Sequence, residues 1–131
     1  MAESLAPRVV EPVSVPIQLR FSDTDMMGHI NNGAFASYTE IGRIAFLNKY
    51  GSENPGVVLA RLAFDFKREV HLGDEVVLTT QCARLGRTSV TFEQVVHANG
   101  EVAVIGEAVV VFIDLASRKP VQRPQHWSLP A

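Results

Sequence analysis

Apolar and polar residues alternate in several stretches of the chain, and one stretch between them has helical spacing instead. Alternation over residues 13–21 predicts a first strand. Pro16 lies within it and donates no ladder hydrogen bond, so this strand is expected to have an unpaired side. Residues 33–50 then carry apolar side chains at three- and four-residue steps, which predicts a helix. Few of its positions are polar, so we expect other elements to cover most of it.

The ends of this helix and the elements after it also follow from the sequence. Asn31 or Asn32 is the expected N-cap, and Gly51 the expected C-terminal stop. Four further strands are predicted at residues 58–66, 75–84, 87–98 and 101–115. The tight turns between them, such as Asn99–Gly100, make neighbouring strands antiparallel. One apolar helix and five strands indicate a two-layer α+β domain, with an antiparallel sheet curled around the helix.

Length and composition narrow the class of protein. The 131 residues are enough for one domain, and 47% are hydrophobic, which provides a core. We expect a domain over residues 13–117, a flexible tail at 1–12 and a proline-rich surface tail at 118–131. The net charge of −2 gives no indication of nucleic acid or of a membrane surface as a partner. With no secretory signal recognised and one cysteine, Cys82, expected to be buried, a cytoplasmic protein is predicted.

The side chains suited to chemistry concentrate in residues 20–32, a loop between the first strand and the helix. This segment holds two carboxylates, an imidazole and two amides, at Asp23, Asp25, His29, Asn31 and Asn32. Free backbone N–H groups at a helix start can hold developing negative charge while a nearby carboxylate acts. From spacing alone, a turn aspartate that bonds its own backbone is the commoner explanation of Asp25.

The pattern Phe-x-Asp-x-Asp-x-x-Gly-His-Ile-Asn-Asn at residues 21–32, followed by Glu40-x-x-Arg43, resembles the hotdog-fold acyl-CoA thioesterases. The branch it resembles is the 4-hydroxybenzoyl-CoA thioesterase type, and the resemblance covers residues 13–115. It implies a five-stranded antiparallel sheet around one long central helix. It also implies hydrolysis of an acyl-CoA, or less readily an acyl-carrier-protein thioester, to a free acid and a thiol. No cofactor is implied, and a homodimer or homotetramer with interface active sites is expected.

The resemblance also implies roles for individual residues. Asp25 would act as general base or nucleophile on the thioester carbonyl. The backbone N–H near Asn32 would face the thioester oxygen, and Gly28 would let the backbone approach the ligand closely. His29 would donate to the carbonyl or orient Asp25, although a packing histidine explains it equally well. Asp23 is expected to bond the loop backbone and hold Asp25 in place.

Other residues are supporting candidates. Asn31 is expected to cap the helix. Glu40 is a reserve catalytic acid, since another hotdog branch uses a helix glutamate, but an ion pair with Arg43 is the better explanation. Among the basic residues, Arg87 is preferred for the CoA phosphates. The other candidates for that role are Lys67, Arg68 and Arg84.

Several alternatives stay open or are set aside. Asp25 and His29 are too few ligands for a metal, so no metal is expected, and His71, His97 and His126 receive no role. An enoyl-thioester hydratase or dehydratase remains an alternative, as does a non-catalytic acyl-CoA binding module. The acid motif argues against the binding module. For assembly, we expect the first strand and the long final strand to present edges that a second copy covers.

Overall fold

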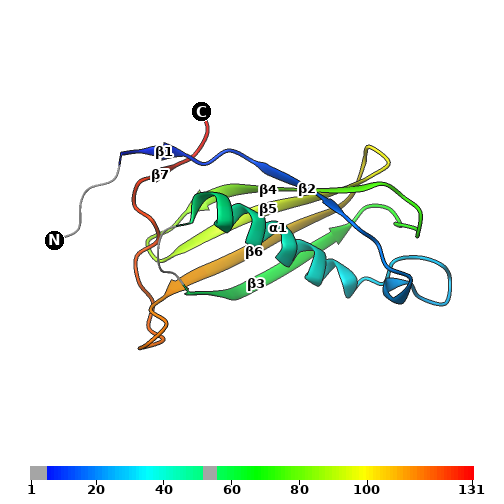
Figure 1. The fold of residues 1–131 in the computed structure, drawn as a ribbon, viewed down its shortest axis with the longest axis horizontal. Helices are drawn as coiled ribbons and strands as arrows, with labels where there is room; N and C mark the ends of the chain where they lie inside the picture. Colours follow the sequence, from blue (N-terminus) through cyan, green and yellow to red (C-terminus); the bar gives the residue numbers. More distant parts are fainter. Residues whose placement is uncertain (1–5, 52–55) are drawn as a thin grey trace.

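A five-stranded antiparallel sheet packs one face against a single long helix (Figure 1). The computed structural model describes residues 6–51 and 56–131. The sheet order is β2-β4-β5-β6-β3. Its strands are β2 (Val13–Ile17), β3 (Gly56–Phe66), β4 (Val76–Leu85), β5 (Ser89–Ala98) and β6 (Glu101–Ile113). Helix α1 (Ala34–Tyr50) lies across the sheet against β4 and β2, which confirms the predicted fold class.

The boundaries differ from the predicted ones at the motif loop. The first strand ends at Ile17, residues 18–20 belong to no helix or strand, and a 3₁₀ turn, η1 (Phe21–Asp23), begins at the last residue of the predicted strand. Helix α1 begins at Ala34 with Gly33 as its N-cap, so the predicted asparagine cap is wrong. Asn31 instead accepts the backbone N–H of Gly33 through Oδ1 at 2.8 Å, one step before the helix.

The opposite end of the helix is as predicted. Gly51 is the C-cap, and its N–H donates to the carbonyl of Leu47 at 2.6 Å. Its backbone is extended, with φ −63° and ψ 155°, and not left-handed.

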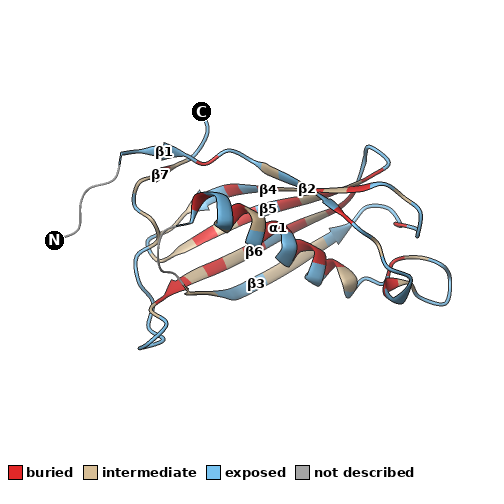
Figure 2. Ribbon diagram, viewed as in Figure 1, coloured by how far each residue is buried: buried red, intermediate tan, exposed pale blue. Residues whose placement is uncertain are grey.

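The core lies between α1 and the inner face of the sheet (Figure 2). Helix positions 35, 38, 42 and 46 point inward, at the spacing the sequence predicted. At Gly42 the helix comes so close that a Cβ atom would lie 2.6 Å from both Leu78 Cδ2 and Thr80 Oγ1. The outer face of α1 exposes about half of Ile41 and Ile44, so the expectation of a largely covered helix is wrong for the single chain.

The two ends of the domain join the core instead of forming loose tails. Strand β1 (Arg8–Val9) pairs in parallel with β7 (Trp127–Ser128). Val10 is fully buried, and the indole of Trp127 donates to the carbonyl of Tyr50 at 3.0 Å. The predicted tails at 1–12 and 118–131 are thus wrong for these residues, because isolated apolar side chains in both segments fill one end of the core. Residues 1–5 lie outside the described residues.

The sheet has two edge strands, and only one was anticipated. β2, with Pro16, pairs with β4 alone, as its proline predicted. The long final strand β6 is not an edge, because it pairs with β5 on one side and β3 on the other. The second edge is β3. In the described ranges, no helix is long and apolar enough to cross a membrane.

Candidate active site

A buried carboxylate anchors the motif loop. Asp23 accepts a hydrogen bond from the hydroxyl of Tyr38 at 2.6 Å and another from Arg20 Nη2 at 3.0 Å. The bonds from Arg20 and then from Tyr38 hold the pKa of this carboxyl below its ordinary value. The carbonyl of Asp23 also accepts the N–H of Asn31 at 2.7 Å. Asp23 therefore joins η1, α1 and the end of the loop, which agrees with its expected structural role.

Asp25 lies at the surface, within a tight turn of the loop. Its Oδ1 accepts the backbone N–H of Met27 at 2.8 Å and that of His29 at 3.1 Å. Its own N–H donates to the carbonyl of His29 at 2.8 Å. Gly28 has a φ of +82°, a conformation that side chains disfavour, and this lets the turn close. Among the residues the structure describes, no donor contacts Oδ2 of Asp25, so one carboxylate oxygen remains available.

The backbone just before α1 offers one free donor. The N–H groups of Asn31, Gly33 and Ala34 donate to Asp23 O, Asn31 Oδ1 and Asn31 O, respectively. The N–H of Asn32, between them, has no acceptor within residues 6–51 and 56–131. This donor lies at the positive end of the helix dipole.

Asp25 and Asn32 line the same cleft, which has a volume of about 350 Å³. Phe35 and Phe66 form an apolar wall, with ring centroids 5.7 Å apart. The remaining lining residues come from the loop and from the segment after β3: His29, Ile30, Lys67, Arg68, Glu69 and Val70. The cleft thus combines an acid, a free N–H donor, aromatic surface and two cations.

The imidazole of His29 faces Glu69 across the cleft, with Nε2 and Oε2 3.1 Å apart. Its contact with Asp25 is made by the backbone. His71, which received no role from the sequence, lies with its ring centroid 4.8 Å from that of His29. The sequence carried no signal for this pairing, because it arises from a β-bridge between two loops, His29 and His71.

Two predicted binding residues lie elsewhere in the chain. Arg87 is in the β4–β5 turn, at the end of the sheet away from the motif loop (Figure 1). Glu40 is exposed and lines a separate small cleft between α1 and β3, together with Leu47, Val57 and Leu59. Arg43 turns inward and donates to Gln94 Oε1 at 3.1 Å, so the expected pairing with Glu40 is replaced by a buried hydrogen bond.

Cys82 is a buried thiol, as expected. Burial raises its pKa to about 11, so it is protonated at neutral pH and takes no part in the cleft.

The comparisons with known proteins agree with the motif and the fold. Residues 27–105 match the family model of the thioesterase superfamily. YsmA of Bacillus subtilis (strain 168) is 32% identical over 110 residues, which cover 80% of this chain and 75% of that protein. A thioesterase from Thermus thermophilus, solved with coenzyme A and Zn, is 35% identical with a TM-score of 0.77, covering 86% of this chain and 91% of that one. A predicted thioesterase from Bacillus stearothermophilus is 26% identical with a TM-score of 0.80, covering 92% of this chain and 100% of that one. The matched family and the five-stranded sheet around α1 lead to one conclusion: the chain belongs to the thioesterase superfamily and has the hotdog fold.

Proposed function

We propose that this protein hydrolyses an acyl-CoA thioester to a free acid and CoA in the cleft beside Asp25. The observation that carries the proposal is that two residues line one cleft: Asp25, which has one carboxylate oxygen without a donor, and Asn32, whose N–H has no acceptor among the described residues. A thioester carbonyl between them has a base or nucleophile on one side and a hydrogen-bond donor on the other. The Thermus relative solved with coenzyme A supports CoA as the carrier of the acyl group.

The chemistry follows from these two groups. As general base, Asp25 takes a proton from water while the water oxygen bonds to the thioester carbon. The carbonyl oxygen becomes an oxyanion, which the Asn32 N–H and the N-terminus of α1 stabilise. The C–S bond then breaks, and the proton held by Asp25 passes to the departing thiolate. As nucleophile, Asp25 would bond to the thioester carbon, the C–S bond would break to release the CoA thiolate, and water would then hydrolyse the resulting anhydride to the free acid and the Asp25 carboxylate.

The rest of the cleft suits the two ends of such a substrate. Phe35 and Phe66 offer aromatic surface for the acyl group. Lys67 and Arg68 line the cleft and would bind the CoA phosphates, in place of the expected Arg87. Arg68 also forms an ion pair with Glu101, which leaves Lys67 as the cation without a carboxylate partner among the described residues. Arg87 could contribute only if it reached the cleft of a second copy.

We also propose that the protein is at least a homodimer. The edge strand β3 exposes Val58 and Leu59 to more than 40%, and the outer face of α1 exposes Ile41 and Ile44 by half. The strand edge presents unpaired backbone N–H and C=O groups, and the helix face beside it exposes apolar side chains to water. Both features favour association with another chain. Pairing β3 with β3 of a second copy would extend the sheet and cover both.

A thiol-release assay over a panel of acyl-CoAs tests the proposed activity. We expect release with the wild-type protein and almost none with Asp25→Asn, which controls for a contaminating esterase. Tight binding without release would favour the non-catalytic binding module. Addition of water to crotonyl-CoA without thiol release would favour the hydratase. Light scattering that showed only monomer at micromolar concentration would overturn the proposed dimer.

A further inference from the structure

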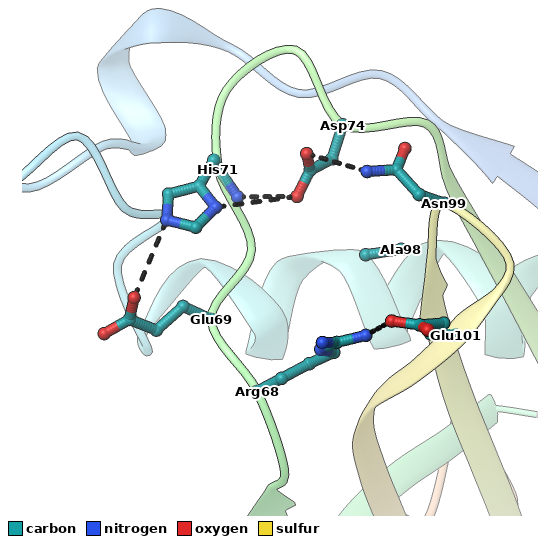
Figure 3. A pocket seen from close by; sticks show the side chains of 7 residues that line it. All are labelled: Arg68, Glu69, His71, Asp74, Ala98, Asn99 and Glu101. Carbon is teal, nitrogen blue, oxygen red and sulfur yellow. Dashed lines mark hydrogen bonds and ion pairs between the residues drawn. The ribbon is translucent and has the colours of Figure 1, made fainter.

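Three side chains able to bind a metal converge at the edge of the cleft, and two of them, His29 and Glu69, line it. His29 comes from the motif loop, while Glu69 and His71 come from the segment between β3 and β4. Nε2 of His29 lies 3.1 Å from Glu69 Oε2, and Nε2 of His71 lies 3.6 Å from the same oxygen. All three ligand atoms lie within 4.8 Å of one another. Figure 3 shows Glu69 and His71 with their side chains turned toward each other.

The two separations to Glu69 fit a bound transition-metal ion. A tetrahedral ion with ligand bonds of 2.0–2.1 Å holds neighbouring ligand atoms about 3.3 Å apart. The two distances to Glu69 lie on either side of this value. Two imidazoles and one carboxylate are also the ligand set of open zinc sites, which leave a fourth position for water or another ligand. The side chains of His71 and Glu69 are half or more exposed, so solvent reaches that position.

The backbone holds the two histidines together before any ion binds. His29 and His71 form an antiparallel β-bridge, and the neighbouring Ile30 donates its N–H to Val70 O at 2.7 Å. The histidine side chains therefore leave adjacent strands on the same side. Because folding already holds the two backbones side by side, less conformational entropy is lost when an ion binds, which favours binding.

A second carboxylate stands behind His71, on its other ring nitrogen. Asp74 Oδ2 lies 3.9 Å from His71 Nδ1 and accepts the backbone N–H of His71 at 2.9 Å. Its Oδ1 accepts Asn99 Nδ2 at 3.0 Å, so the carboxylate is fixed in place (Figure 3). A carboxylate near the second nitrogen favours the tautomer whose Nε2 is free to bind a metal.

We propose that His29, Glu69 and His71 form a binding site for one divalent transition-metal ion of the Zn²⁺ type. The bound ion would link two segments: the loop that contains Asp25 and His29, and the segment after β3 that contains Glu69 and His71. The site rests on these three side chains and not on the proposed hydrolysis. It revises the sequence-based expectation of no metal, which considered only Asp25 and His29.

Titration of the metal-free protein with ZnCl₂ by calorimetry tests the site. We expect one ion per chain. His71→Ala and Glu69→Gln should each weaken binding by about 10-fold or more, the scale of a lost ligand or ligand support. Glu69→Gln is informative because it can still hydrogen-bond to an imidazole. His126→Ala, outside the cluster, should bind as the wild type does.

Cobalt provides a second readout that does not depend on activity. Co²⁺ in a tetrahedral site of nitrogen and oxygen ligands absorbs visible light, and Zn²⁺ should displace it with loss of that absorption. Saturating Zn²⁺ should also raise the melting temperature of the wild type but not of His71→Ala. Equal zinc affinity in the wild type and in both cluster variants would overturn the proposal. So would a loss in His126→Ala as large as that in His71→Ala.

Discussion

The hydroxyl of Tyr38 donates a 2.6 Å hydrogen bond to Oδ2 of Asp23, joining the buried face of α1 to the motif loop. Both residues are buried, so the bond is shielded from water. Asp25 lies two residues beyond this anchor, and Asn31 is bonded to the carbonyl of Asp23. The position of the proposed catalytic acid therefore depends on an acid that does not face the substrate.

Tyr38→Phe should weaken this anchor without changing the packing of the ring. A hydrogen bond to a charged group contributes about 2 kcal/mol, and the free energy of unfolding should fall by that amount. Urea unfolding at pH 7 measures it. Tyr50→Phe is the matched control, because within residues 6–51 and 56–131 the Tyr50 hydroxyl makes one hydrogen bond, in which it accepts the backbone N–H of Glu11. An equal loss of unfolding free energy in both variants would show that the bond from Tyr38 to Asp23 stabilises the fold no more than the bond to the Tyr50 hydroxyl does.

The same carboxylate predicts how stability responds to acid. Its pKa is held below the ordinary 3.8, first by Arg20 and then by Tyr38, so the folded state binds a proton less readily than the unfolded chain. This part of the stability is complete above pH 3.8 and is lost as the pH falls through the lower, folded value. Unfolding free energies measured from about pH 6 down to about pH 2 should decline less steeply in Asp23→Asn than in the wild type. A residual decline is expected from Asp114, whose pKa is lowered by the N–H groups of Ser117 and Ala116.

The order of strands and the helix face could be predicted from the sequence because they depend on local periodicity. The alternation of apolar and polar residues predicted the bounds of β3, β4, β5 and β6 to within a few residues. The spacing of Phe35 and Phe46 predicted the inward side of α1. Sheet order could not be predicted in this way. Whether β3 or β6 forms the edge depends on pairing between strands far apart in the chain, which leaves no local pattern.

The motif could be located from the sequence, but its contacts could not. Asp23 and Asp25 look equivalent as loop aspartates, and only the fold buries one against Tyr38 and exposes the other. Lys67 and Arg68 resemble ordinary surface charges, yet the chain returns past the loop and places them at the cleft. His71 gave no pattern at all, because its partner His29 is 42 positions earlier in the chain.

Gly28→Val should lower turnover while the fold survives. The φ of +82° at this position strains any β-branched residue, and the open space around it means that the effect is conformational and not a clash. Gly28→Asn is the control, because asparagine tolerates this region far better. We expect kcat to fall more in the valine variant, with melting temperatures that stay close. Full activity in Gly28→Val would show that the geometry of this turn does not matter for catalysis.

Lys67→Ala should weaken the use of CoA substrates specifically. Lys67 lines the cleft, so its removal should raise KM for an acyl-CoA by roughly 10-fold, about 1.4 kcal/mol for a lost charged contact. An acyl-pantetheine lacks the nucleotide phosphates, and its KM should stay unchanged. Arg118→Ala is a control, since that residue lies in an exposed turn outside the cleft. Equal losses with both substrates would argue for a structural effect of Lys67.

Asp25→Asn should abolish most turnover, whereas Glu40→Gln should not. Asparagine keeps an oxygen that can accept the N–H groups of Met27 and His29, so the loop should keep its shape while the basicity is lost. Turnover should therefore fall by about 10²-fold or more, the scale of a lost general base, with acyl-CoA binding retained.

Glu40→Gln should lower turnover far less than Asp25→Asn does, because Glu40 lines a different cleft from Asp25. The turnover of Asp23→Asn should lie between those of the other two variants, because this change loosens the loop but keeps the carboxylate of Asp25. Steady-state kinetics on one acyl-CoA, together with binding measured by calorimetry, separates the three variants. If Glu40→Gln were the inactive variant and Asp25→Asn kept most of its turnover, the catalytic acid would lie on the helix.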